Sequence, residues 1–352
     1  MIYHCEDHTC NYWDEGEKLP ERCPQCGRKL LRANEADMTG DDWTALGNTL
    51  WDAEASDKKR MVDCFRKAAY LGSAWGVCNL GICMEQGNGV EADPVQAFWL
   101  YQQAVEMGSL NAVCCLGVCY QYGIGTAPDA EKAAELYCKA AEYGSPRGQM
   151  LLARAFHDGI GVEADAAEAV HWVRAAAYQR YGEGMYRLGV CYEYGDGVEQ
   201  NWEHAVHWFR EAAESGVSVA MTDLGYCYEK GCGVEQSWEQ AFSWYRRGAE
   251  CGYPVSMSNL GLCYKRGYGV EQNWQEAIKW YEQGAQCGNL QSMHNLACCY
   301  ERGEGVEQNE ERALYWYRRS AEGGNGSAMC NLGRCYKRGY GVEQNWQEAI
   351  KW

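Results

Sequence analysis

The sequence predicts an all-α protein, a solenoid of stacked two-helix repeats that follows a small N-terminal metal-binding β module. Two observations predict this fold. A glycine motif returns every 36 residues through most of the 352-residue chain, and a period of that length is typical of helical repeats. Two cysteine pairs lie within the first 30 residues, before the periodic part begins.

The N-terminal segment, residues 1–32, is predicted to be a zinc-ribbon-like module. Cys23-Pro24-Gln25-Cys26 has the spacing of a turn that directs two thiolates at one tetrahedral ion. The other pair, Cys5 and Cys10, is separated by four residues, and His8 occupies the place of the second ligand of a Cys-x-x-Cys pair. We favour Cys5, Cys10, Cys23 and Cys26 around a structural zinc ion, with His8 as the alternative to Cys10. Metal binding would supply the folding energy that so short a segment lacks.

Residues 41–73 are predicted to be a degenerate repeat that caps the solenoid. They keep Leu46-Gly47 and the run from Cys64 to Ala69, but they lack the glycine motif. Terminal repeats of solenoids are often atypical in this way.

Residues 74–352 are predicted to be regular repeats of 36 residues. In each, a core leucine lies on a first helix and is followed by Gly or Ala, and from Leu116 onward it shares one helical face with an aromatic residue four positions later. Cysteines three residues after the leucine are expected to be small buried packing residues. The leucines are Leu80, Leu116, Leu152, Leu188, Leu224, Leu260, Leu296 and Leu332.

A Gly-x-Gly loop and a second helix complete each repeat. No strand precedes these glycines, so they are predicted to end the first helix and not to bind a nucleotide. The second helix is predicted to pack through an Ala and a Trp, with the Trp at positions 172, 208, 244, 280 and 316. Its predicted N-caps are Asp93, Asp129, Asp165, Asn201, Ser237, Asn273, Asn309 and Asn345.

The motifs resemble the Sel1-like repeat family, relatives of the tetratricopeptide repeat. The resemblance rests on Asn-Leu-Gly-x-Cys-Tyr at 259–264, Ala-x-x-Trp-Tyr-Arg at 241–246 and the Gly-x-Gly-Val loops. It implies a right-handed superhelical α/α solenoid that binds partner proteins or peptides in a concave groove. The last repeat stops at Trp352 within its second helix, so we expect that the natural protein continues or that this chain is a fragment.

The predicted groove lies on the first-helix face opposite the core leucine, at positions two before it and two, five and six after it. This face changes from acidic and aromatic to basic along the later repeats, which suits an extended peptide with an acidic segment. The alternative to peptide binding is that these cations have a structural role, because cations near a helix C-terminus complement the helix dipole. The candidate partner-binding residues are Tyr226, Lys230, Asn259, Lys265, Arg266, Asn295 and Arg302, and the basic ridge of the same face continues to Lys337 and Arg338.

Composition narrows the function classes. A net charge of −17 disfavours nucleic acid as a partner, and no apolar run approaches the length of a membrane span. The N-terminus lacks the features of a secretion signal, so we expect a cytoplasmic protein of bacterial type whose 21 cysteines are mostly reduced thiols or metal ligands.

We find no catalytic constellation and expect no enzyme. The favoured function is a scaffold or adaptor that binds proteins. The alternative is a metal- or redox-responsive regulatory protein that signals through the zinc ribbon. The oligomeric state is not predicted.

Overall fold

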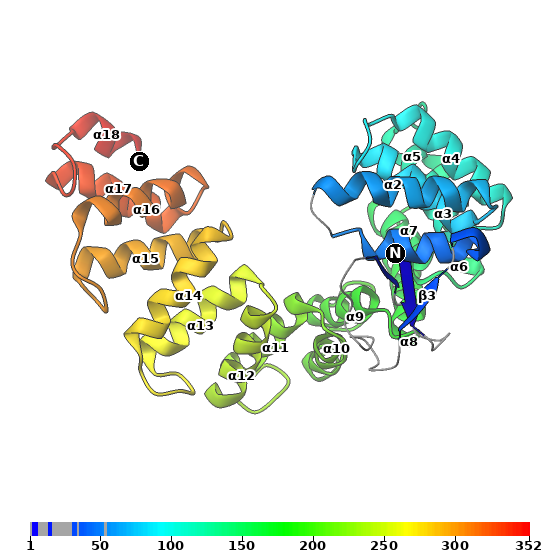
Figure 1. The fold of residues 1–352 in the computed structure, drawn as a ribbon. Helices are drawn as coiled ribbons and strands as arrows, with labels where there is room; N and C mark the ends of the chain where they lie inside the picture. Colours follow the sequence, from blue (N-terminus) through cyan, green and yellow to red (C-terminus); the bar gives the residue numbers. More distant parts are fainter. Residues whose placement is uncertain (1, 6–12, 16–29, 34, 53–54) are drawn as a thin grey trace. The chain divides into compact units, whose positions relative to one another are not determined.

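The computed structural model describes residues 2–5, 13–15, 30–33, 35–52 and 55–352 (Figure 1). The chain divides into two compact units, Met1–Gln179 and Arg180–Trp352. The uniform period of the sequence does not predict a division at this point.

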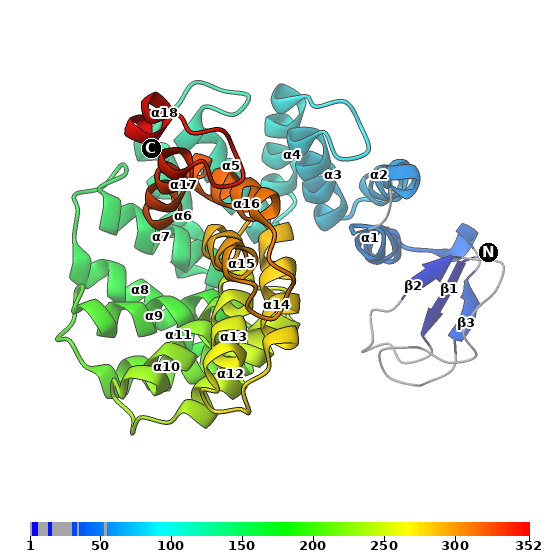
Figure 2. The ribbon, with the colours of Figure 1, turned by 90° about the vertical axis from the view of Figure 1, so that its left-hand side faces the viewer.

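The first unit begins with a three-stranded antiparallel sheet of order β2-β1-β3. The strands are β1 (Ile2–Cys5), β2 (Trp13–Glu15) and β3 (Leu30–Ala33), and a short 3₁₀ helix, η1 (Glu35–Asp37), follows. In the register, Cys5 of β1 pairs with Leu30 of β3. Figure 2 shows this sheet beside the first helix. Of the predicted metal ligands, Cys10, Cys23 and Cys26 lie outside the described residues.

Four helix pairs make up the rest of the first unit. The two helices of a pair pack against each other, and the second helix of each pair packs against the first helix of the next. The helices are α1 (Gly40–Thr49), α2 (Ala55–Tyr70), α3 (Ala74–Gln86), α4 (Pro94–Glu106), α5 (Leu110–Tyr122), α6 (Ala130–Glu142), α7 (Pro146–Asp158) and α8 (Ala166–Tyr178).

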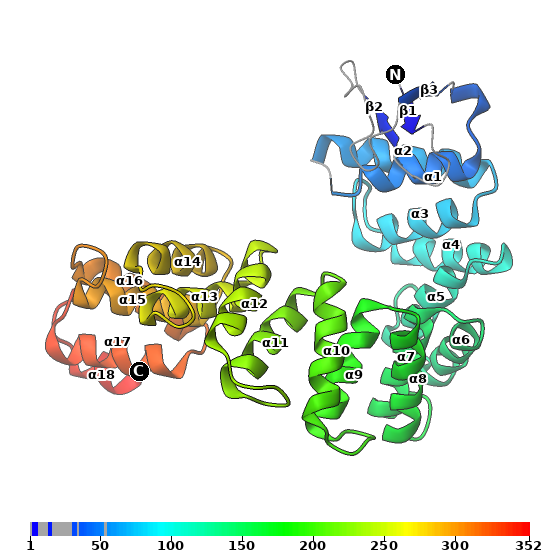
Figure 3. The ribbon, with the colours of Figure 1, turned by 90° about the horizontal axis from the view of Figure 1, so that it is seen from below.

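The second unit repeats the same arrangement, and Figure 3 shows its successive pairs side by side. Its final helix is short, because the chain reaches Trp352. The helices are α9 (Gly182–Tyr194), α10 (Trp202–Glu214), α11 (Ser218–Lys230), α12 (Trp238–Glu250), α13 (Pro254–Arg266), α14 (Trp274–Gln286), α15 (Leu290–Arg302), α16 (Glu310–Glu322), α17 (Gly326–Arg338) and α18 (Trp346–Lys351).

The predicted N-caps of the second helices are confirmed. From Asp93 to Asn345, each cap side chain accepts a hydrogen bond from the backbone N–H three residues later. Asn309, for example, accepts from the N–H of Arg312 at 2.8 Å. Such a cap stabilises a helix by about 1 kcal/mol. The first helices end in left-handed glycines, as the loop motif predicted.

The small residue after each core leucine admits the ring of the second helix. A Cβ on Gly261 would lie 2.5 Å from Cε1 of Tyr281, a distance that real Cβ contacts do not reach. The loop glycine Gly269 approaches the preceding repeat in the same way, because a Cβ there would collide with the backbone oxygen of Trp238. These glycines set how closely helices and neighbouring repeats pack.

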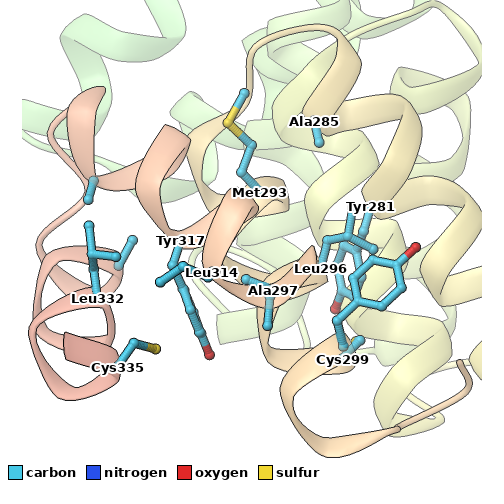
Figure 4. Packing of buried hydrophobic residues seen from close by; sticks show 14 of the residues in the cluster. Tyr281, Ala285, Met293, Leu296, Ala297, Cys299, Leu314, Tyr317, Leu332 and Cys335 are labelled. Atoms are coloured by element: carbon cyan, nitrogen blue, oxygen red, sulfur yellow. The ribbon is translucent and has the colours of Figure 1, made fainter. Parts of the chain in front are cut away.

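The core residue of the second helix differs from the prediction. Trp244 is buried, but Trp172, Trp208, Trp280 and Trp316 are only partly buried. The residue after the Trp fills the core instead. Tyr245, Tyr281 and Tyr317 are at most 1% exposed, and Figure 4 shows Tyr281 and Tyr317 among Leu296, Ala297 and Leu332.

The ladder of first-helix cysteines is confirmed as inward-facing except at Cys191, which is only partly buried. Cys83, Cys119, Cys227 and Cys263 are at most 2% exposed. Burial raises the pKa of Cys83 to about 11, and burial is the largest cause that raises the pKa of Cys263 to about 12. These thiols act as small apolar groups in the core.

Candidate binding wall of the second unit

The first helices α11, α13, α15 and α17 carry the candidate partner-binding residues, and we call their groove-facing side the wall. One part of the predicted groove face is wrong. Thr222 and Ser258, two positions before a core leucine, are 6% and 3% exposed, so they cannot line a groove. Thr222 instead shares a hydrogen bond with Ser256 of the next repeat. In these two repeats the neighbouring first helix covers this position.

A row of contacts between repeats, which we call the seam, occupies this position. The residue two before the leucine of one repeat meets the residue one before the leucine of the next. His294 and Asn331 make such a pair, with 3.1 Å between Nε2 and Nδ2. Tyr186 and Asp223 make another, and burial raises the pKa of the Asp223 carboxyl.

The candidate asparagines therefore border the seam. Asn259 and Asn295 are both partly buried. The side-chain oxygen of Asn295 accepts a hydrogen bond from Gln291 at 3.0 Å within its own helix.

Tyr226 and Lys230 form an exposed patch at the end of α11. The Tyr226 side chain is 44% exposed, and the Lys230 ammonium lies 5.6 Å from its ring centre. Lys230 also pairs with Glu229 at 2.7 Å, and this hydrogen bond is the main cause that raises the pKa of Lys230. The patch offers an aromatic face with a partly neutralised cation.

Lys265 is held inside the stack of repeats. Its side chain is only 13% exposed, and its ammonium lies 3.1 Å from the Glu304 carboxylate in the loop of the next repeat. The same ammonium lies 5.2 Å from the ring centre of Trp274. Lys265 therefore links two repeats, and it contributes less free charge to the wall than the sequence suggested.

Lys265 occupies the position at which the two neighbouring repeats carry a glutamate that accepts a hydrogen bond from a buried tyrosine. In the neighbouring repeats the buried tyrosine of the second helix donates to a first-helix glutamate: Tyr245 to Glu229 at 2.8 Å, and Tyr317 to Glu301 at 2.6 Å. Burial is the largest cause that raises the pKa of both phenols. Lys265 stands where the glutamate would be, and the buried Tyr281 hydroxyl has no hydrogen-bond partner within the described chain.

The basic end of the wall is hollowed between α15 and α17. The hollow has a volume of about 360 Å³. Glu301 within it is already engaged by Tyr317 and by Arg334, at 3.2 Å. Arg302 lies 3.7 Å from Glu304. The lining residues are Glu301, Arg302, Arg334, Cys335, Arg338 and Tyr340.

Two of these lining residues, Cys335 and Tyr340, lie off the predicted groove face, and Arg334 lies on it but was not named as a candidate. The sequence carried a signal for Arg334, which is the single difference between residues 259–280 and 331–352, where it replaces Leu262. Arg266 and Arg302 are exposed, as a binding role requires. The structure thus moves the basic centre of the wall from Lys265 to the arginines of α15 and α17.

The Sel1 repeat family model matches eight consecutive segments that together cover most of the chain. They are residues 76–109, 112–145, 146–181, 182–217, 218–253, 254–289, 290–325 and 326–352. The chain belongs to the Sel1 repeat family. The segments coincide with the helix pairs described above, and the pair α1–α2 precedes the first Sel1 repeat that the model matches.

Two solved structures are similar to this Sel1 repeat chain. One is a protective antigen present in uropathogenic Escherichia coli strains, 29% identical, with a TM-score of 0.62 over 89% of this chain and 75% of that one. The other is a Sel1 repeat protein from Oxalobacter formigenes, 33% identical, with a TM-score of 0.62 over 68% of this chain and 94% of that one. No curated protein matches the chain.

Two properties of the described residues bear on the other predictions. None of the described helices combines the length and the apolar composition that crossing a membrane requires. Among the same residues, no group of three or more His, Cys, Asp or Glu side chains is arranged to hold a metal ion.

Proposed function

We propose that this chain is a scaffold or adaptor that binds partner proteins or peptides along the wall of its second unit. Sel1-like repeat solenoids as a class mediate protein–protein interactions, and stacked repeats offer long surfaces for extended ligands. The proposal adds a location and a ligand chemistry to this general role.

The observation that carries the proposal is the arginine-lined hollow. Arg302, Arg334 and Arg338 surround one depression in a chain whose net charge is −17. Guanidinium groups bind carboxylates in a two-pronged manner, and such pairs are stronger than neutral hydrogen bonds. Glu301 and Glu304 take up part of the charge of Arg334 and Arg302, and Arg338 adds a third cation to the hollow. We infer that the hollow accepts an acidic segment.

The patch of Tyr226 and Lys230 would bind the same ligand further along the wall. An exposed aromatic ring is a common anchor in protein interfaces. A peptide that reaches from this patch to the hollow would have an apolar or aromatic residue at one end and carboxylates at the other. Arg266 is exposed at the end of α13, the first helix that comes between α11, which carries the patch, and α15, which lines the hollow.

The test compares charge reversal in the hollow with charge reversal elsewhere. The Arg302→Glu, Arg338→Glu double variant should bind a fluorescently labelled peptide of glutamates with one terminal tyrosine at least about tenfold more weakly. Arg246→Glu is the control, because Arg246 is exposed on a second helix and pairs within that helix, with Glu250 at 2.7 Å. Equal loss in the control, or unchanged binding by the double variant, would refute the proposal.

We also propose that Cys5, Cys10, Cys23 and Cys26 hold a structural zinc ion. The Cys-x-x-Cys spacing of Cys23 and Cys26 supports this ligand set, and Cys5 ends a described strand that pairs with Leu30. A bound zinc ion would cross-link the two cysteine pairs through four thiolates. Metal analysis should find one zinc per chain, lost in Cys23→Ser and kept in Cys251→Ser, which removes an exposed thiol. A chain purified without zinc would contradict the assignment.

The same preparation separates the scaffold from the regulatory alternative. A metal-responsive regulator should change its peptide affinity when a chelator removes zinc. A scaffold with a purely structural ion should keep the affinity of its second unit.

A further inference from the structure

We propose that Cys78 and Cys115 form a redox-active thiol pair that a hydroperoxide converts into a disulfide between two neighbouring repeats of the first unit. This inference is independent of the proposed peptide binding. Cys78 lies on α3 and Cys115 on α5, which are the first helices of successive repeats, and the two are 1% and 4% exposed.

The two thiols occupy a seam position. In the second unit this relation brings together His294 and Asn331, which are within hydrogen-bond distance. Cys78 is two residues before Leu80, and Cys115 is one residue before Leu116, so they are the equivalent pair. The two thiols lie in one buried cluster of the first unit and interact with each other.

A ring of hydrogen bonds surrounds the pair. The Arg147 Nη1 donates to the Asn111 Oδ1 at 2.6 Å and to the Cys115 Sγ at 3.6 Å. The Asn111 Nδ2 donates to the Cys78 Sγ at 3.6 Å. The contact between the two thiols closes the ring, and the Cys115 sulfur accepts from a donor that carries a full positive charge. This is the environment that stabilises a thiolate.

Electrostatics agrees with this geometry. The pKa of the Cys115 thiol is lowered, first by the hydrogen bond from Cys78 and further by the Arg147 charge, while burial and Glu85 act in the opposite direction. The pKa of Cys78 is raised, chiefly by its bond to Cys115. Cys119, which is equally buried but has no guanidinium beside it, has its pKa raised to about 12 by burial first of all. Of these three buried thiols, Cys115 is the one whose pKa is lowered.

The reaction balances with a hydroperoxide as the oxidant. The Cys115 thiolate attacks one peroxide oxygen, the O–O bond breaks, and protonation of the leaving oxygen releases water when the peroxide is hydrogen peroxide. The sulfur of Cys78 then attacks the sulfenic acid of Cys115, the S–O bond breaks, and a second water leaves. Two thiols are oxidised by two electrons and one peroxide is reduced to two waters. A small oxidant suits sulfurs that are almost fully buried.

The experiment treats the full chain with hydrogen peroxide, blocks the remaining thiols in denaturant and maps the peptides by mass spectrometry. We expect a Cys78–Cys115 cross-link that forms about tenfold faster than any oxidation of Cys83 or Cys119, the internal controls of equal burial. Arg147→Met should slow the cross-link about tenfold. Cys78→Ser should instead leave a sulfenic acid on Cys115 that dimedone labels.

Two results would overturn the inference. In one, Cys78 and Cys115 remain thiols while the exposed Cys251 and Cys287 are oxidised. In the other, the cross-link forms at the same rate in Arg147→Met, which would show that the ring does not activate Cys115. Circular dichroism of each variant confirms that the helices are retained.

Discussion

Two consecutive repeats of the second unit, residues 218–253 and 254–289, bury a tyrosine at the same position. They differ in whether the tyrosine hydroxyl has a hydrogen-bond acceptor. Tyr245 donates to Glu229, whereas Tyr281 faces a helix that carries Lys265 in place of the glutamate. Both rings are nevertheless at most 1% exposed. Ring packing therefore places the tyrosine, and the hydrogen bond is a separate contribution.

The lysine that replaces the glutamate gains a different function. Lys265 reaches forward to Glu304 at 3.1 Å and so links its repeat to the next one. Glu229 contributes within its own repeat. A glutamate at this position thus stabilises the pair of helices within a repeat, whereas a lysine stabilises the junction between repeats. The lysine leaves the tyrosine hydroxyl without a hydrogen-bond partner in the described chain.

The largest expected effect tests whether packing is equal in the two repeats. Tyr245→Ala and Tyr281→Ala should each lower the free energy of unfolding by about 3–5 kcal/mol, because both remove a buried ring. Urea denaturation followed by circular dichroism measures this. Tyr226→Ala, which removes an exposed ring, is the control. A much smaller loss for Tyr281→Ala would mean that the two rings are not packed alike.

Removing only the hydroxyl should change the free energy of unfolding differently in the two repeats. Tyr245→Phe should cost about 1.5–3 kcal/mol, because a hydrogen bond to a charged acceptor is lost. Tyr281→Phe should be neutral or stabilising, since it removes a buried hydroxyl without a partner. Equal losses in the same denaturation experiment would show that Tyr281 has a partner in solution.

The two lysines should also differ. Lys265→Met should lower the free energy of unfolding by about 1–2 kcal/mol, because it breaks a partly buried ion pair between repeats. Lys230→Met should cost at most about 0.5 kcal/mol, since its pair with Glu229 is exposed to solvent on the lysine side. The thermal midpoint of each variant gives the same ranking if Lys265 does link the repeats.

The smallest expected effect concerns the residue before the core leucine, which is Asp223 in one repeat and Asn259 in the other. Burial raises the folded-state pKa of Asp223, so its protonated form stabilises the fold at low pH and this contribution is lost as the pH rises through the folded pKa. Asp223→Asn should therefore stabilise the chain at pH 7 by about 0.5–1 kcal/mol. The gain should shrink as the pH falls below the pKa of Asp223. A gain that does not depend on pH would contradict a buried carboxylate as its cause.

Much of the fold was predictable because its signals are local. The N-caps from Asp93 to Asn345 and the helix-ending glycines act within one turn of the chain, so their residue type is sufficient evidence. The choice between Trp280 and Tyr281 as core residue was not predictable in this way. Adjacent residues differ by about 100° around a helix, and the neighbouring helix decides which of them it covers.

The charge of the candidate binding site was predictable, but its detail was not. The sequence indicated a basic wall that includes Arg338, yet it overestimated the free charge of Lys265 and did not indicate Tyr340 as a lining residue. An ion pair such as Lys265–Glu304 joins residues in different repeats, and no spacing within one helix reveals it.

By itself, the sequence determined the period, the helix boundaries and the burial of the leucine and cysteine ladders, because each depends on residues within one repeat. Only the tertiary structure decided the seam, which includes the Cys78–Cys115 pair and the contact of His294 with Asn331. Seam partners lie about one repeat apart in sequence. They meet only once neighbouring repeats have stacked, and the closeness of that stacking depends on contacts such as the one between Gly269 and the Trp238 backbone.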